Sequence, residues 1–333
     1  MGLFIRKSIE SLQAEAAQSG SKSLKRVLGP VSLVALGVGV IIGAGLFSIT
    51  GTVASEFTGP SITLSFIIAA IGCCFAGLCY AEFASMIPVA GSAYTYSYAT
   101  MGELIAWIIG WDLVLEYTVA ATTVSISWSR YMVVFLENLG IHLPHALTAC
   151  PWDGGIINIP AMLIVVLMSL FLIRGTEGSS IFNGFIVFLK IAVILIFVVL
   201  GWQFIQIENY TPYIPENTGK LGEYGFSGIL RGAAVVFFAF LGFDAVSTAA
   251  QETKNPKRDM PIGILVSLLV CTLLYVLFAH VMTGVAHYTE FGGQQGIAPV
   301  AVAIEHMGAP DASGVIQPAF PWLNKAIILA ILF

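Results

Sequence analysis

Glycines interrupt the first apolar segment of the chain, which reads Gly37-Val38-Gly39-Val40-Ile41-Ile42-Gly43-Ala44-Gly45-Leu46. A glycine weakens a helix by roughly 1 kcal/mol relative to alanine in water. Backbone groups freed within a membrane need partners in the protein or in a wet cavity. The segment is therefore either a surface for close helix packing through small residues, or a break in a helix. The N–H groups at such a break attract an anionic group, for example a carboxylate.

A second interrupted segment, Phe237-Phe238-Ala239-Phe240-Leu241-Gly242-Phe243-Asp244, has a glycine and an acidic residue in the middle of another apolar run. It lies five predicted spans after the first, and an odd offset gives the two segments opposite orientations. Paired broken helices in matching positions of an inverted repeat indicate the binding site of a transporter. The pair therefore favours binding over packing alone. We interpret Asp244 as a structural cap of the segment in preference to a substrate contact.

Lys190 lies in the middle of an apolar run, Ile186-Val187-Phe188-Leu189-Lys190-Ile191-Ala192, too deep for its ammonium group to reach water easily. Ionisable residues within spans are costly and are therefore functional candidates. Burial disfavours the charged form of a lysine, so this side chain can gain and lose a proton during a working cycle. We favour this proton-coupling role over a permanently charged strut held by carbonyls at a helix end.

Asp112 and Glu116 are four residues apart in Gly110-Trp111-Asp112-Leu113-Val114-Leu115-Glu116-Tyr117 and share one face of a predicted helix. They either face a polar cavity or pair with cations on neighbouring helices, and the spacing fits both arrangements equally. Glu116 is the second candidate for a functional residue after Lys190, because an ionisable residue within a span is costly.

The composition of the chain predicts that these residues lie on helices that cross a membrane. The chain of 333 residues is 57% hydrophobic and 10% charged, with a mean hydropathy of +0.90. A soluble domain carries about 25% charged residues because its surface faces water, so most of this surface needs lipid as its solvent. Apolar runs long enough to cross a bilayer as helices occur at about 31–55, 61–86, 100–137, 157–173, 181–206, 228–250 and 261–287.

These runs predict a polar tail at 1–29 and a transmembrane domain at 30–333, with seven full spans and a partial eighth that stops at Phe333. The eighth run is cut off within an apolar stretch, so we expect the chain to continue in a longer protein. Lys and Arg of short loops stay on the cytoplasmic side, and a cytoplasmic N-terminus places nine of them inside and two outside. These nine include Lys22, Lys25 and Arg174.

Several functional classes find no support. A nucleic-acid partner would need clustered Lys and Arg on an exposed face, and no such cluster occurs. The five cysteines lack the paired spacing of a metal or redox site. No metal, cofactor or phosphate-binding motif and no catalytic constellation is present, so we expect no cofactor and no enzyme activity.

Four motifs in order resemble the amino acid–polyamine–organocation superfamily of permeases, and more closely its cationic amino acid transporter branch, including the bacterial members. They are Ile41-Ile42-Gly43-Ala44-Gly45-Leu46-Phe47, Gly110 to Tyr117, Leu172-Ile173-Arg174-Gly175 leading to Lys190, and Phe238 to Ala245 continuing to Pro261. The resemblance implies an all-α polytopic membrane protein with the leucine-transporter fold. In that fold two five-helix repeats are inverted, and the second repeat is incomplete in this chain.

The resemblance also implies a division of roles among the candidates. Ile41, Gly43, Ala44, Gly45 and Leu46 would bind the α-carboxylate and backbone of an amino acid. Carbonyls of Phe238, Ala239 and Leu241 would hold its α-amino group, with Phe238 or Phe240 as part of a gate. Lys190 would replace the cation of sodium-coupled relatives, Glu116 would face the substrate side chain, and Asp112 and Asp244 would serve gating or structure. Ala44 departs from relatives that carry Thr or Ser there, so one hydroxyl contact is missing.

Secondary active transport of amino acids by alternating access is therefore the expected function, with proton coupling or exchange. The expected partners are a cationic or small neutral amino acid, protons and the lipid bilayer, and the oligomeric state is left open. The expected location is the plasma membrane, the inner membrane of a bacterium. A seven-span receptor or sensor that transports nothing is the alternative, and a membrane enzyme is weaker than both.

Overall fold

The computed structural model describes residues 5–17, 26–173, 179–292, 298–310 and 316–332. Lys22, Lys25, Arg174 and Gly175, which entered the orientation and motif predictions, lie outside this range. The described chain forms two compact units. Unit 1 comprises residues 1–41, 70–120 and 240–272, and unit 2 comprises residues 42–69, 121–239 and 273–333. Helices α4 (Ile62–Met86), α6 (Glu103–Glu137) and α11 (Pro256–Val285) contribute residues to both units.

The apolar runs fold as helices, which confirms the predicted all-α polytopic membrane protein. In the described residues, five helical stretches are long and apolar enough to cross a membrane: Pro30–Met86, Glu103–Glu137, Gly184–Phe204, Gly225–Glu252 and Pro256–Val285. Two shorter apolar helices cover Ile159–Phe171 and Pro321–Leu332. The predicted spans 31–55 and 61–86 fall within one of these stretches, so the domain boundaries and the number of spans stay predictions.

Unit 1 contains four short helices besides its parts of the shared ones. They are α1 (Ile9–Ala17), α2 (Pro30–Ile41), α5 (Ser92–Thr100) and α10 (Ala245–Thr248). Helix α2 packs closely on α11 and α10, because a Cβ at Gly37 would lie 2.6 Å from Ser267 Oγ and 3.0 Å from Val246 Cγ2.

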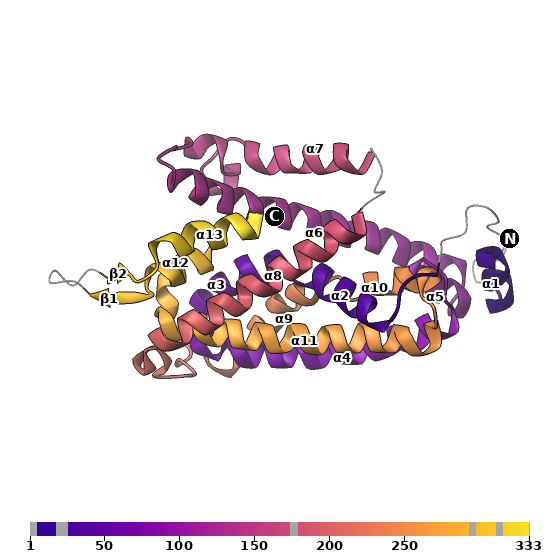
Figure 1. The fold of residues 1–333 in the computed structure, drawn as a ribbon. Coiled ribbons are helices and arrows are strands. Elements are labelled where there is room, and N and C mark those ends of the chain that lie inside the picture. The colour runs from indigo at the N-terminus through magenta and orange to yellow at the C-terminus, as the bar shows by residue number, and fades with distance from the viewer. Residues whose placement is uncertain (1–4, 18–25, 174–178, 293–297, 311–315, 333) are drawn as a thin grey trace. The chain divides into compact units, whose positions relative to one another are not determined.

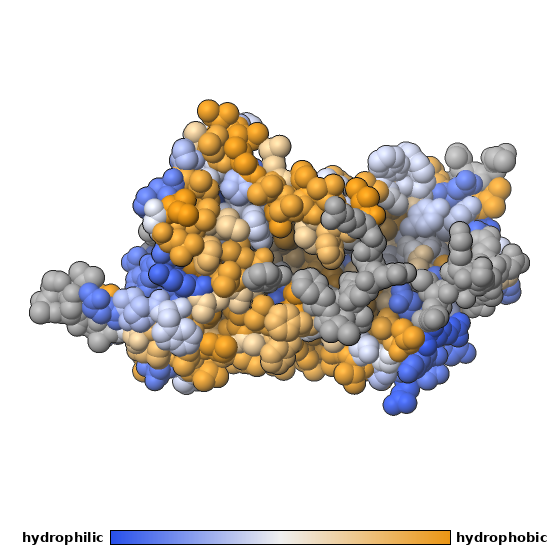
Figure 2. Space-filling view, turned by 45° about the horizontal axis from the view of Figure 1, so that its top comes forward, coloured by the Kyte–Doolittle hydropathy of each residue, from blue (hydrophilic) through white to orange (hydrophobic). Residues whose placement is uncertain are grey.

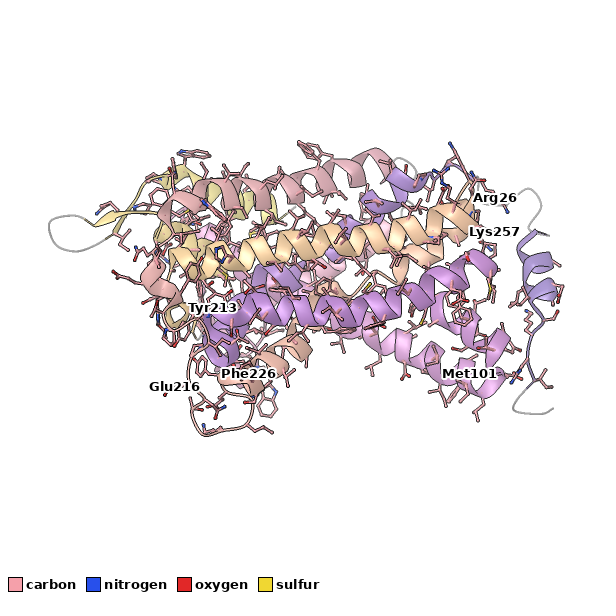
Figure 3. The ribbon with its side chains drawn as sticks, turned by 90° about the horizontal axis from the view of Figure 1, so that it is seen from below. Arg26, Met101, Tyr213, Glu216, Phe226 and Lys257 are labelled. Carbon is pink, nitrogen blue, oxygen red and sulfur yellow. The ribbon has the colours of Figure 1, made fainter. Side chains whose placement is uncertain are left out.

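A short backbone strap joins the start of α2 to the segment after α10 within unit 1. The N–H groups of Val27 and Leu28 donate to Glu252 O at 2.9 and 3.0 Å, and Lys254 N donates back to Leu28 O at 3.0 Å. Arg26 and Lys257 lie on the same side of this unit (Figure 3). These bonds hold the chain just before α2 against the chain just after α10, and both parts belong to unit 1.

Unit 2 holds the remaining helices: α3 (Thr50–Val53), α7 (Ile159–Ile173), α8 (Ser179–Gly201), α9 (Gly225–Val236), α12 (Pro299–Glu305) and α13 (Pro321–Leu332). Its core includes Phe278, whose ring centroid lies 4.9 Å from that of Phe197 and 6.2 Å from that of Phe47. Helix α12 packs against α13 in this unit. An antiparallel hairpin, β1 (Gly308–Pro310) and β2 (Ile316–Pro318), lies beside α12 (Figure 1).

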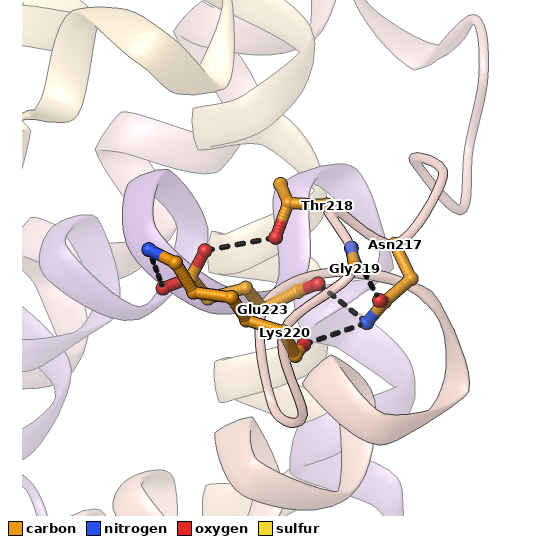
Figure 4. A network of polar contacts seen from close by, with 5 residues as sticks. All are labelled: Asn217, Thr218, Gly219, Lys220 and Glu223. Carbon is orange, nitrogen blue, oxygen red and sulfur yellow. Dashed lines mark hydrogen bonds and ion pairs between the residues drawn. The ribbon is translucent and has the colours of Figure 1, made fainter.

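Hydrophobic side chains cover much of the helical surface in view in Figure 2. Helix α7 illustrates this, since Met162, Leu163, Val166 and Phe171 are all more than half exposed. An apolar surface of this kind is stable against lipid and costly against water. The loop that precedes α9 is polar and internally bonded instead (Figure 4). In it Asn217 Nδ2 donates to the carbonyls of Lys220 and Glu223 at 3.0 and 2.8 Å.

Candidate functional site

The first interrupted segment is a genuine break in helical geometry. Helix α2 ends at Ile41, residues 42–43 lie outside any helix, and a π-helical turn covers Gly45–Ile49. In unit 2 the N–H groups of Leu46 and Phe47 both donate to Gly43 O, at 3.1 and 3.3 Å. Wide π turns inside helices occur frequently at functional sites. A restarting helix also presents first-turn N–H groups, which favours an anion there.

The second interrupted segment meets the first in unit 2. Residues Phe237–Phe240 form a 3-10 turn after α9. A Cβ built at Gly45 would lie 2.3 Å from Ala239 Cα and 2.7 Å from Ala239 Cβ. Only a glycine allows the two backbones to approach this closely. Gly45 is therefore required for packing and also lies beside the break, so the two interpretations of the glycines are not exclusive.

Two buried tyrosines donate hydrogen bonds to carbonyls of the interrupted segments in unit 2. Tyr275 on α11 donates to Ala239 O at 2.9 Å, and Tyr131 on α6 donates to Phe47 O. Both side chains are almost fully buried. Neither tyrosine belongs to one of the motifs that mark the site in the sequence. A usable signal existed, because a tyrosine within an apolar span must find a partner for its hydroxyl.

Lys190 reaches the first break from α8, and its Nζ donates to Ile42 O at 3.0 Å. Ile42 is fully buried and follows the last residue of α2. A cation at the C-terminal end of a helix is stabilised by the last carbonyls and by the helix dipole. The contact links the predicted coupling residue to the predicted binding segment. It is equally compatible with the structural strut that we considered from the sequence.

Asp244 is the centre of a group of polar residues in unit 1. It is 5% exposed and accepts hydrogen bonds from Tyr117 Oη at 3.0 Å and Ser92 Oγ at 3.4 Å. Asp244 occupies the N-cap position of α10, but its side chain makes no capping hydrogen bond. The predicted cap is therefore wrong in its chemistry: the carboxylate binds hydroxyl groups of α5 and α6 instead. These two elements are distant in sequence, so spacing alone could not reveal them.

Glu116 lies close enough to Asp244 for their charges to interact, whereas Asp112 is exposed on the same helix. The aromatic side chains of Tyr80 and Phe243 pack near this group, with ring centroids 5.5 Å apart. Tyr96 on α5 stacks on Phe83, and burial raises the pKa of Tyr96 to about 12. Its hydroxyl therefore stays protonated at physiological pH.

The structure divides the predicted residues into two groups. Those in unit 2 are Gly43, Ala44, Gly45, Leu46, Lys190, Phe238 and Ala239. Those in unit 1 are Ile41, Asp112, Glu116, Phe240, Leu241 and Asp244. Across the described part of the chain, no group of three His, Cys, Asp or Glu side chains could hold a metal ion. Among the predicted residues, those in unit 2 comprise parts of the two interrupted segments and one lysine, Lys190.

A family model described as "Amino acid permease" matches residues 28–320. The chain belongs to the amino acid permease family. The sequence-based resemblance is thus confirmed, and the chain is an integral membrane protein. Its relatives are permeases and transporters rather than enzymes.

Three relatives show how widely the family's named substrates vary. The branched-chain amino acid permease BcaP of Bacillus subtilis (strain 168) is 48% identical over 319 residues, which are 95% of this chain and 66% of that protein. The methylthioribose transporter of the same strain is 42% identical over 333 residues, 99% of this chain and 69% of that protein. Vacuolar cationic amino acid transporter 4 of Arabidopsis thaliana is 37% identical over 294 residues, 85% and 47% of the two chains. The chain spans about two thirds of the length of the bacterial relatives.

Proposed function

We propose that this chain is part of a secondary transporter that moves amino acids across a membrane by alternating access. Its membership of the amino acid permease family supports the class of function. The observation that carries the proposal is the meeting of the two interrupted segments at Gly45 and Ala239. Broken helices of this kind supply unpaired backbone groups at membrane depth, where a polar solute otherwise finds no partners.

In this proposal, unit 2 binds the part of the substrate that all amino acids share. The N–H groups of Gly43, Ala44 and Gly45 receive the α-carboxylate, because a helix N-terminus favours an anion. A substrate contact by Leu46, whose own N–H donates to Gly43 O, stays a prediction. Carbonyls at Phe238 and Ala239 receive the ammonium group. The 3-10 turn at Phe237–Phe240 supports this assignment, since its carbonyls do not follow regular α-helical geometry.

Lys190 is the proposed coupling residue. Its protonated form donates to Ile42 O at 3.0 Å and so holds the first break. Loss of the proton would remove the positive charge of Lys190 beside this carbonyl and weaken the turn that follows it. Proton binding and substrate binding would then favour each other, which is a coupling free energy between two sites.

In unit 1, we propose that Asp244 and Tyr117 act as a gate or structural lock. A buried carboxylate that pairs with a tyrosine on another helix is stable only while the helices stay packed. Substrate contacts by Ile41, Phe240 and Leu241, a side-chain contact by Glu116, and a structural role for Asp112 stay predictions. So does the bacterial inner membrane, and so does the cytoplasmic N-terminus, an orientation that the distribution of Lys and Arg supports.

The test uses the protein expressed from its complete gene and reconstituted in proteoliposomes. Branched-chain, cationic and small neutral amino acids are offered at two external pH values, with methylthioribose as a competing candidate. We expect saturable uptake of at least one amino acid, faster when the exterior is acidic. Binding without uptake would favour the receptor or sensor. Uptake of methylthioribose without any amino acid would overturn the proposed substrate class.

A further inference from the structure

Tyr275 has a fixed position and a fixed direction in unit 2. It lies on the apolar helix α11, and its side chain is 0% exposed. The ring packs against Phe66 of α4, with centroids 5.4 Å apart and planes inclined by 54°. A buried hydroxyl needs a hydrogen-bond partner, and this one donates to Ala239 O at 2.9 Å. The packing of the ring therefore determines where the hydroxyl points.

The peptide group that accepts this hydrogen bond is confined on its other side. Ala239 is 2% exposed and belongs to the 3-10 turn Phe237–Phe240. The backbone of Gly45 approaches it so closely that an added Cβ would lie 2.3 Å from Ala239 Cα. A carbonyl oxygen has two lone pairs. Tyr275 donates to this oxygen, and a carbonyl that accepts one hydrogen bond keeps the capacity to accept a second from an N–H donor.

We propose that Tyr275 is a positioning residue for recognition of the substrate's α-amino group, because its hydroxyl holds the Ala239 carbonyl in the binding direction. This inference rests on the proposed function and adds a residue that no sequence motif indicated. The hydroxyl withdraws electron density from the same oxygen, so it supplies orientation and not a stronger acceptor. A carbonyl held in place needs no reordering when the ammonium group arrives, which improves affinity.

The test compares an amino acid with its deaminated analogue, the same carboxylic acid lacking the α-amino group. Binding of both is measured on the protein from its complete gene, as wild type, Tyr275→Phe and Tyr131→Phe. Tyr131→Phe is the matched control, because it removes one buried hydroxyl from the Phe47 carbonyl, which we assign no substrate contact. Tyr275→Phe should reduce the preference for the amino acid by roughly 2- to 10-fold. Tyr131→Phe should leave this preference unchanged.

A purely structural role for Tyr275 would weaken binding of the amino acid and the analogue equally, and an unchanged preference would overturn the inference. An equal loss of preference in Tyr131→Phe would overturn it too. Phe66→Leu provides a second route, since it frees the ring of Tyr275 but keeps its hydroxyl, and it should reduce the preference less than Tyr275→Phe. A wild type that binds amino acids without preferring them over the analogue refutes amino-group recognition alone. A wild type that binds no amino acid refutes the proposed function itself.

Discussion

Adding one methyl group at Gly45 probes the contact between the two interrupted segments directly. In Gly45→Ala the new Cβ would lie 2.3 Å from Ala239 Cα, 2.7 Å from Ala239 Cβ and 2.9 Å from Ala239 N. Carbon atoms in favourable contact are at least about 3.5 Å apart, so the closest overlap is about 1.2 Å. The obstacle is backbone and not the flexible end of a side chain. The two segments must therefore separate.

Overpacking a buried site by one methyl group costs about 1 to 3 kcal/mol, and occasionally more. We expect the upper end here because the backbone cannot rotate away. A loss of about 3 kcal/mol lowers the ratio of folded to unfolded protein by roughly 100-fold or more. The same displacement would move Ala239 O away from Tyr275 Oη, now 2.9 Å away, so substrate affinity should fall as well.

Gly43→Ala is the matched control within the same motif, because no atom outside Gly43 and its two chain neighbours lies within 4 Å of an added Cβ there. Its stability should stay within about 0.5 kcal/mol of wild type, whatever happens to substrate binding. The assay is unfolding of purified protein by SDS titration in one detergent. Equal stability of Gly45→Ala and wild type would refute the packing argument. An equal loss of stability in Gly43→Ala would show that both glycines act through helix geometry and not through contact.

Three further predictions concern single groups. Tyr117→Phe removes the 3.0 Å hydrogen bond to buried Asp244 and should cost about 1 to 3 kcal/mol of stability in SDS unfolding. Unchanged stability would contradict the proposed lock between Asp244 and Tyr117. Gly242→Ala should also destabilise the protein by at least about 1 to 2 kcal/mol, because φ is +103° and an added Cβ would lie 2.6 Å from another side chain. Hydrogen bonds from Thr218 and Lys220 lower the pKa of Glu223, so its stabilising effect on the loop is complete above the ordinary value of about 4.3 and lost as pH falls through the lowered one. Limited proteolysis of this loop should therefore accelerate in acid, and Glu223→Gln should abolish that pH dependence.

The helical fold was predictable because a bilayer imposes length and polarity on every span. Runs such as 261–287 contain no Asp, Glu, Lys or Arg, and the structure places α11 at Pro256–Val285. The hairpin of β1 and β2 was not predicted, since each strand has only three residues and the flanking sequence is rich in Gly and Pro. Such short strands carry no periodic signal of their own.

The two breaks were predictable from their glycines, but the partners of the buried polar groups were not. Lys190 is conspicuous in the sequence because a charge is rare in a span. The residues around it do not indicate that its acceptor is Ile42 O. The hydrogen-bond partner of Tyr275 lies 36 positions away in the sequence, and the tyrosine that donates to Asp244 lies 127 positions away. Hydrogen bonds of this kind arise from tertiary packing, which periodicity and local spacing do not encode.

The most direct test of the account is uptake driven by an imposed pH gradient, in proteoliposomes containing wild-type protein or Lys190→Met. Wild-type protein should accumulate the amino acid only when the exterior is acidic. Lys190→Met keeps the apolar stem but cannot bind a proton or donate to Ile42 O. We predict that this variant loses accumulation and its response to pH while remaining folded. Accumulation in Lys190→Met that equals wild type and follows the same pH dependence would contradict the account.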